Sequence, residues 1–160
     1  MEKILGQYGR VTIYMEGNHP SPMYYVDGGS EPNPYGNLAV LLEDDELEEV
    51  MYNGGSQCVK VAHRDHGMCR TNIFVDDHNG LEIARNIAAF TSVPLGDGPG
   101  MVPIFDGRLP DGSRVNGTIP PVSPDGPTLT IRKFREDPLT IIDLVKFGTV
   151  NLRLAAMMWV

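Results

Sequence analysis

Hydrophobic and polar residues alternate along several short runs of the chain, which is the spacing of half-buried β-strands. Residues 9–15 (GRVTIYM) and 23–26 (MYYV) are separated by the turn sequence GNHPSP and predict a small N-terminal hairpin. Residues 58–63 and 68–75 flank the loop Arg64-Asp65-His66-Gly67, whose glycine suits the positive φ of a hairpin turn. The pattern therefore predicts a sheet built from short antiparallel strands.

Two segments have helical rather than alternating spacing. Leu38–Met51 (LAVLLEDDELEEVM) predicts a helix that ends at Asn53-Gly54-Gly55, with its acidic residues on a solvated face. A second helix is predicted from an N-cap at Asp76 or Asp77 to about Phe90. Its apolar face would consist of Leu81, Ile83, Ala84, Ile87, Ala88 and Phe90.

Three further strands are predicted in the second half of the chain, over about residues 104–109, 114–119 and 128–134. Their connections, LPDGS and PPVSPDGP, have the chemistry of tight turns. The spacing thus extends the antiparallel sheet to the C-terminal side of the second helix.

The last part of the chain predicts two short helices. Asp137 and Pro138 are suited to the N-cap and first position of a helix, and Gly148 to its end, so we expect a helix over Pro138–Phe147. Another helix is predicted to begin near Thr149 or Asn151 and to continue to the last residue without a cap. Because few native domains end inside an apolar helix, we expect the chain to be the front part of a longer protein.

These elements predict an α+β fold, in which a small antiparallel sheet packs against helices, and divide the chain into three parts. Residues 1–37 are expected to form an N-terminal β-hairpin segment. Residues 38–135 would form the main α+β domain. Residues 136–160 would be a linker followed by the first helix of a further domain.

Composition and charge narrow the class of protein. The 160 residues are 41% hydrophobic and 21% charged, as in an ordinary globular domain. A net charge of −8 argues against a general nucleic-acid-binding protein. Two cysteines are too few for a disulfide scaffold and indicate a reducing compartment. The sequence has neither a signal peptide nor a stretch of ~20 apolar residues, so we expect a soluble, cytoplasmic protein.

Positive charge is concentrated locally in this acidic chain. Residues 108–135 contain five cations (Arg108, Arg114, Arg132, Lys133 and Arg135) and two acids (Asp111 and Asp125), whereas residues 43–49 contain six acids and no base.

Strand alternation places Arg114, Asn116 and Thr118 on one face of a strand. It places Arg132 with Thr128 and Thr130, and a hairpin closed on Asp111-Gly112 would bring Arg108 close to Arg114. Clustered guanidinium groups need neutralising carboxylates or an anion. Two interpretations remain open: a phosphate site, which suits the planar fork of arginine, and surface ion pairs with Asp106, Asp111 and Asp125.

A second group of residues has the ligand types of a zinc site, namely Cys58, His63, His66 and Cys69. Cys58 and His63 fall on opposite faces of a regular strand, so both could bind one ion only if the strand bent. The alternative is that Cys58 is a small buried hydrophobic residue and that the histidines lie on or near the hairpin loop.

The chain contains no G-x-x-x-x-G-K-[ST] loop that would hold nucleotide phosphates. It also has no serine, cysteine or paired-carboxylate arrangement that suggests catalysis. We therefore expect no enzymatic activity from this chain alone.

The sequence resembles the segment that precedes the P-loop in secretion ATPases of the type II/IV superfamily, which includes type II secretion, type IV pilus, Tad-pilus and archaeal flagellum motors. The resemblance rests on DGRLPDGSRVNGTIPPVSPDGPTLTIRKF and the following DPLTIIDLVKFGTVNLRLAAMMWV, while EVMYNGG and VKVAHRDHGMCRTNIFVDD are similar to the archaeal branch. It covers residues 46–160, and its most specific elements are LPDGSRVN and LTIRKF.

The resemblance implies a PAS-like N-terminal α+β domain of a hexameric cytoplasmic ATPase, hinged to a RecA-like motor domain. It implies that Arg114 and Arg132 contact nucleotide phosphates, with Arg108, Lys133 and Arg135 as possible supporting residues. ATP and Mg²⁺ would bind to the full-length parent. The implied partners are the motor domain, neighbouring subunits and a membrane platform protein, which would hold the ATPase at the cytoplasmic membrane.

Two competing functions stay open at this point. A stand-alone PAS-like module would bind a small ligand in a closed apolar pocket. A zinc-stabilised interaction domain would contain stoichiometric zinc and unfold with chelator.

Overall fold

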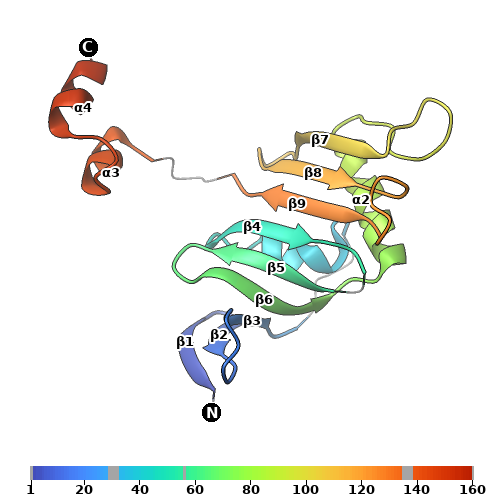
Figure 1. Cartoon of the computed structure of the whole chain (residues 1–160), viewed down its shortest axis with the longest axis horizontal. Coiled ribbons are helices and arrows are strands. Elements are labelled where there is room, and N and C mark those ends of the chain that lie inside the picture. Colours follow the sequence, from blue (N-terminus) through green and yellow to red (C-terminus); the bar gives the residue numbers. More distant parts are fainter. Residues whose placement is uncertain (1, 29–32, 56, 135–138, 160) are drawn as a thin grey trace.

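The structure, a computed structural model, describes residues 2–28, 33–55, 57–134 and 139–159. Nine strands form one mixed sheet with the order β1-β2-β3-β6-β5-β4-β9-β8-β7 (Figure 1). The strands are β1 (Lys3–Tyr8), β2 (Val11–Met15), β3 (Met23–Val26), β4 (Leu47–Tyr52), β5 (Cys58–His63), β6 (Gly67–Phe74), β7 (Ile104–Arg108), β8 (Arg114–Thr118) and β9 (Thr128–Arg132). The α+β class predicted from the sequence is confirmed.

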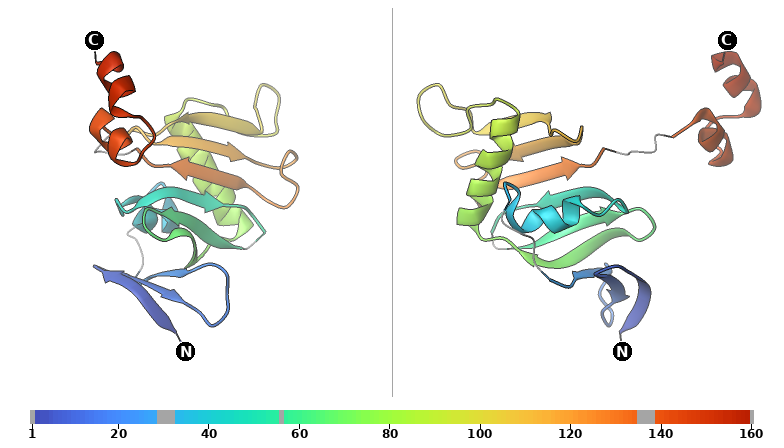
Figure 2. Two further views of the ribbon diagram at one scale, coloured as in Figure 1. Left: turned by 60° about the vertical axis from the view of Figure 1, so that its left-hand side comes forward. Right: turned by 180° about the vertical axis from the view of Figure 1, so that it is seen from behind.

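The helices are short apart from one. They are η1 (Gly36–Leu38), a 3₁₀ turn, and α1 (Ala39–Leu42), α2 (Asp77–Phe90), α3 (Ile141–Lys146) and α4 (Leu152–Met158). α1 and α2 lie against one face of the sheet and leave the opposite face uncovered (Figure 2). None of the described helices is long and apolar enough to cross a membrane.

The N-terminal strands continue the main sheet. β2 and β3 form the predicted antiparallel hairpin, and β3 then pairs in parallel with β6 through Met23 opposite Arg70 and Tyr24 opposite Thr71. Asn72 of β6 strengthens this junction, because its side-chain amide bonds to both the N–H and the C=O of Val26. β1 was not predicted, since most of its residues are exposed and it lacks a clear alternation of burial.

The predicted helix over Leu38–Met51 is wrong for most of its length. The helix ends after Leu42, and residues 47–52 form β4, an inner strand between β5 and β9. The register shifts between Leu47 and Glu49, which indicates a β-bulge. The bulge turns both Leu47 and Val50 into the core although they are three residues apart, and this spacing imitates a helix.

The long helix α2 is confirmed, with Asp76 as its N-cap accepting a hydrogen bond from Asn79 N at 2.9 Å. Its buried face contains Ile83, Ala84, Ile87 and Ala88, whereas Leu81 is half-buried. Phe90, predicted for the same face, is instead 43% exposed and stacks on Tyr35.

Glycine allows α2 to approach the sheet closely. A Cβ at Gly80 would lie 2.5 Å from the ring of Tyr52 in β4. Beneath the helix, the inward residues of β8 and β9 complete the core; they are Val115, Leu129 and Ile131. The helix thereby fixes one face of the sheet and leaves the polar residues of β8 and β9 on the other.

The C-terminal helices α3 and α4 pack on each other and lie apart from the sheet in Figure 1. Helix α3 begins later than predicted, because Thr140 is its N-cap and forms a capping box with Asp143. The predicted cap at Asp137 and Pro138 lies outside the described residues. The predicted N-cap of the last helix, Asn151, is confirmed by its hydrogen bond from Leu154 N.

Candidate anion-binding site

Three arginines form a row across three neighbouring strands. Arg108 of β7 lies opposite Arg114 of β8, and Arg114 lies opposite Arg132 of β9. Directly opposed residues of antiparallel strands project from the same face of the sheet. The next residues along the strands, Val115 and Ile131, are buried, so the arginines project from the uncovered face. We call Arg108, Arg114 and Arg132 the arginine row.

Two carboxylates lie beside the arginine row. Glu49 of β4 is the register partner of Arg132, and its Oε1 accepts from Arg132 Nε at 2.9 Å and from Nη2 at 2.8 Å. Asp106 Oδ2 lies 3.7 Å from Arg114 Nη2, which is an ion pair without a short hydrogen bond. The Glu49 side chain is 24% exposed, whereas the Arg132 side chain is 73% exposed. Glu49 is thus the fixed partner and Arg132 the accessible one.

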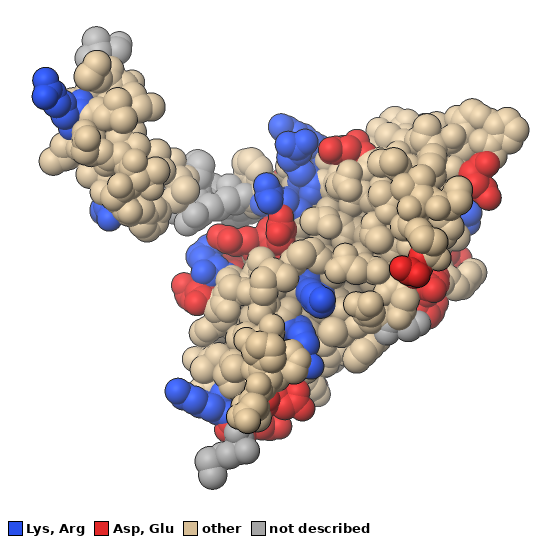
Figure 3. Space-filling view, in the orientation of Figure 1, with Lys and Arg blue, Asp and Glu red and all other residues tan. Residues whose placement is uncertain are grey.

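Two members of the row, Arg114 and Arg132, border a shallow hollow of about 190 Å³ on the open face of the sheet. This volume is well above the ~10–15 Å³ that one water molecule needs, so the hollow has room for an oxyanion. In Figure 3 basic and acidic atoms lie side by side at this end of the sheet, where the chain leaves β9. The hollow is lined by Glu49, Asp106, Arg114, Val115, Asn116, Thr130 and Arg132.

The turn between β7 and β8 fixes the arginine row. Asp111 accepts hydrogen bonds from the backbone N–H of Ser113 at 3.0 Å and from its hydroxyl at 2.7 Å. The buried Ser113 Oγ in turn accepts from Phe134 N, just beyond β9. Gly112 has a φ of +90°, which few other residues adopt. The motif DGS therefore connects the ends of β7, β8 and β9. The carboxylate of Asp111 is used within this turn.

The prediction from sequence that the three arginines lie close together is correct. Glu49 was not predicted as their neighbour, because residues 38–51 were expected to form a helix. Of the acids considered as ion-pair partners, Asp106 does pair with Arg114. A strand assignment for residues 47–52 would have revealed Glu49, because its alternation with Val50 places it on the outer face of β4.

Lys133 follows Arg132 directly along the chain and therefore lies on the opposite face from the arginine row. Its side chain is 8% exposed, and Nζ donates to the backbone oxygen of Asp44 and lies 3.9 Å from Asp45 Oδ1. Burial lowers the pKa of Lys133, partly opposed by the Asp45 and Asp44 charges. Arg135, the other supporting residue, lies outside the described residues.

The candidate zinc ligands are spread along the β5–β6 hairpin. Cys58 and His63 are the first and last residues of β5, which puts their Cα atoms ~16 Å apart at ~3.3 Å per residue. Cys69 is buried, and its Sγ contacts the Gly67 backbone oxygen. In the part of the chain that the structure describes, no three His, Cys, Asp or Glu side chains are grouped so that they could hold a metal ion.

His63 belongs instead to a cluster of polar side chains that includes the buried Tyr24 and the half-buried Tyr8 and Asp44, which we call the tyrosine cluster. Both tyrosine hydroxyls donate to Asp44 Oδ2, from Tyr8 at 2.8 Å. Asp65 N donates to His63 Nδ1, so the neutral ring carries its proton on Nε2, 3.1 Å from the Tyr8 hydroxyl. The cluster joins β1 and β3 to the turn before β4.

Burial dominates the ionisation of the tyrosine cluster. It raises the pKa of Tyr8 and Tyr24 well above the usual range, and their hydrogen bonds to Asp44 act in the same direction. Burial, followed by the nearby His66, lowers the pKa of His63. The hydroxyls and the ring are therefore neutral at pH 7 and act as hydrogen-bonding groups in the interior.

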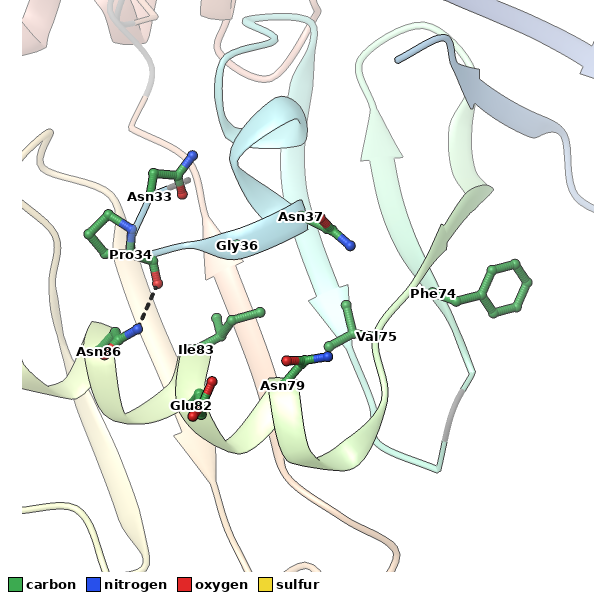
Figure 4. Close-up of a pocket in the computed structure, with 10 residues that line it drawn as sticks. All are labelled: Asn33, Pro34, Gly36, Asn37, Phe74, Val75, Asn79, Glu82, Ile83 and Asn86. Carbon is green, nitrogen blue, oxygen red and sulfur yellow. Dashed lines mark hydrogen bonds between the residues drawn. The ribbon is translucent and has the colours of Figure 1, made fainter. Parts of the chain in front are cut away.

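A second pocket, of about 250 Å³, lies between residues 33–37 and α2 (Figure 4). Val75 and Ile83 supply apolar surface, and Asn86 Nδ2 donates to the Pro34 backbone oxygen at 3.4 Å. Its lining contains four asparagines and one acid, Glu82, but no lysine or arginine. This lining offers amide groups to a neutral ligand and lacks the positive charge that a phosphate requires.

The chain is similar in sequence to longer archaeal proteins. Uncharacterized protein MJ0781 of Methanocaldococcus jannaschii is 48% identical over 124 residues, which are 78% of this chain and 17% of that protein. Uncharacterized protein MJ0900 of the same organism is 38% identical over 126 residues, which are 78% of this chain and 22% of that protein. The chain thus spans less than a quarter of the length of either relative. It matches no protein-family model.

The fold is similar to part of a secretion ATPase. The VirB11 ATPase from the Brucella suis type IV secretion system, solved in complex with sulphate, matches 72% of this chain and 33% of its own chain. The TM-score is 0.55 at 21% sequence identity. The chain therefore has a fold that also occurs as a domain-sized part of a type IV secretion ATPase.

Proposed function

We propose that the chain is the N-terminal regulatory and oligomer-contact domain of a hexameric ATPase that powers protein secretion or the assembly of a pilus or archaellum. In the parent protein, Arg114 and Arg132 contact the phosphates of ATP that a separate P-loop domain holds together with Mg²⁺. The similarity of fold to part of VirB11 supports this class, as does the greater length of the archaeal relatives.

The observation that carries the proposal is the direct opposition of Arg114 and Arg132 on the uncovered face of the sheet. Two neighbouring guanidinium groups can each donate two hydrogen bonds to phosphate oxygens. They project from inner strands of a sheet anchored by α2, so their backbone positions are rigid. This arrangement suits a domain that detects charge on a nucleotide bound by another domain.

The division of labour follows from the chemistry of phosphoryl transfer, which depends mainly on positioning and charge stabilisation. This chain supplies arginines, whereas the P-loop lysine, the Mg²⁺-binding hydroxyl and the catalytic acid would come from the motor domain. A nucleotide that contacts both domains would favour a closed arrangement, in which the two domains lie together, over an open one. ATP hydrolysis would remove part of these contacts and allow the domains to separate. The chain alone is expected to have no ATPase activity.

Partners and location follow from the same proposal. The arginine row would face the motor domain, and other surfaces would contact neighbouring subunits of the hexamer and a membrane platform protein. The parent would act in the cytoplasm, at the inner surface of the membrane.

The proposal is tested on the longer parent protein that it requires, in which a P-loop domain follows this chain. A G-x-x-x-x-G-K-[ST] motif is expected within about 30 residues after Val160. In that protein, Arg114→Ala and Arg132→Ala should each lower the ATPase rate by at least 10-fold without lowering the melting temperature. Absence of the motif, or normal ATP turnover in both variants, would refute the proposed function.

A further inference from the structure

We propose that the carboxylates of Glu49 and Asp106 compete with anions for the arginine row and thereby determine which anions bind there. In the anion-free protein they hold Arg132 and Arg114, and a ligand with several phosphate groups displaces them. This inference rests on the proposed function, which assigns phosphate contact to the same arginines. To the proposed function the inference adds two points. It names the residues that set the affinity for the anion, and it names the class of ligand, which is a di- or triphosphate in preference to a single phosphate.

The geometry of the contact between Glu49 and Arg132 allows a ligand to replace Glu49 as the partner of Arg132. Both hydrogen bonds from Arg132 end on one oxygen, Oε1, and use two of the five N–H donors of the guanidinium group. The carboxylate is positioned by an inner strand, while the arginine extends toward solvent. The arginine can therefore change partners by side-chain rotation, without movement of the sheet.

The contact between Asp106 and Arg114 is weaker. The shortest distance is 3.7 Å, and the two side chains are 58% and 66% exposed. Solvent screens such a pair, so a ligand displaces Asp106 more easily than Glu49. Glu49 is accordingly the stronger competitor.

Charge around the hollow favours highly charged ligands. The two arginines and two carboxylates that line it balance, and Arg108, which lies opposite Arg114 on β7 and outside the lining, adds one positive charge, which attracts a monoanion only weakly. One phosphate group can contact two neighbouring guanidinium groups, whereas a chain of phosphates can contact all three. The arginine Cα atoms span about 10 Å across three strands spaced ~4.8 Å apart, which matches an extended ligand better than a single ion.

The test is calorimetric titration of the 160-residue chain with pyrophosphate and with inorganic phosphate at low ionic strength, where surface electrostatics are least screened. Glu49→Gln removes the charge and keeps the shape of the side chain. We expect it to tighten pyrophosphate binding by about 3- to 10-fold, and Asp106→Asn by about 2-fold. Arg132→Ala should weaken binding by at least 10-fold.

Glu48→Gln is the matched control, because Glu48 is the exposed neighbour of Glu49 and its backbone, rather than its side chain, bonds to Lys133. It removes the same charge from the adjacent position and should change affinity by less than 2-fold. Thermal unfolding of each variant confirms that the fold is retained. Glu49→Asp, which keeps the charge on a shorter side chain, should bind pyrophosphate more weakly than Glu49→Gln.

Two results would overturn the inference. One is an equal effect of Glu49→Gln and Glu48→Gln on pyrophosphate affinity. The other is that neither the wild-type chain nor Glu49→Gln binds pyrophosphate at millimolar concentration. In both cases the proposed function is decided separately, by the ATPase rates of the arginine variants in the longer protein.

Discussion

The arginine row and the tyrosine cluster both combine carboxylates with hydrogen-bond donors, but they differ in burial and in the stability of their contacts. In the tyrosine cluster, Asp44 accepts from the hydroxyls of the half-buried Tyr8 and the buried Tyr24 and ties the N-terminal strands to the main sheet. In the arginine row, Arg114 and Arg132 are largely exposed and paired with acids at the edge of an open hollow.

The difference separates groups that hold the fold from groups that are available for a ligand. A buried acceptor that loses its partners leaves unsatisfied donors, at a cost of ~1–3 kcal/mol each. An exposed ion pair contributes only ~0–1 kcal/mol, so exchanging its partner is easy. The two regions meet at Arg132 and Lys133, consecutive residues whose side chains project from opposite faces of the sheet.

The largest expected effect is on the tyrosine cluster. Asp44→Ala removes the acceptor of both Tyr8 and Tyr24 and should lower the free energy of unfolding by about 3 kcal/mol. Urea denaturation measures this change. Asp45→Ala is the control, because its carboxylate is 84% exposed, and a loss below about 0.5 kcal/mol is expected. Equal losses in the two variants would show that the cluster does not hold the N-terminal strands.

The next effect compares the consecutive residues Arg132 and Lys133. Lys133→Ala removes one of the two donors to the Asp44 backbone oxygen, which keeps Leu47 N, and it also removes a buried side chain. It should destabilise the fold by about 1 kcal/mol, with pyrophosphate affinity within 2-fold of wild type. Arg132→Ala should do the reverse: unfolding free energy within about 0.5 kcal/mol and affinity reduced at least 10-fold. Loss of anion binding in Lys133→Ala, with the fold intact, would contradict the separation of the two faces.

The smallest expected effect is a pH dependence from His63. Burial and His66 lower its pKa in the folded state below the usual ~6.5, so the unfolded chain binds more protons between the two values. Stability should be full above pH ~6.5 and decrease as the pH falls, by less than ~1.4 kcal/mol per pH unit. Protonation of Nδ1 would also break the bond from Asp65 N.

The measurement for His63 is the urea midpoint at pH 7.5 and pH 5.5. His63→Gln should reduce the difference between these pH values, because it removes the titrating ring from contact with Tyr8 and Asp44. An unchanged pH dependence in His63→Gln would mean that other groups cause it.

Local chemistry was sufficient to predict the hairpins, α2 and the arginine row. Asp76 caps α2 as expected, and the DGS turn sets Arg108 opposite Arg114 because its geometry is encoded within a few residues. Alternation in β8 and β9 then determines the face of Arg114 and Arg132. These features depend on neighbours in sequence, which is why the sequence reveals them.

Features that depend on distant partners could not be predicted in the same way. β4 appeared helical because its bulge spaces Leu47 and Val50 by three residues. Only its pairing with β5 and β9 makes it a strand, and that pairing places Glu49 beside Arg132. The tyrosine cluster likewise joins Tyr8 to His63 across 55 positions, a contact for which the sequence carries no local signal.

The most direct test of the central claim is a titration of the ¹⁵N-labelled chain with tripolyphosphate, followed by NMR of backbone amides and arginine side chains. We expect saturable shifts that are largest at Arg108, Arg114 and Arg132 and that disappear in the Arg114→Ala/Arg132→Ala double variant. Shifts centred on the asparagine-lined pocket beside α2, or unchanged saturable binding in the double variant, would contradict the assignment of the anion site to the arginine row.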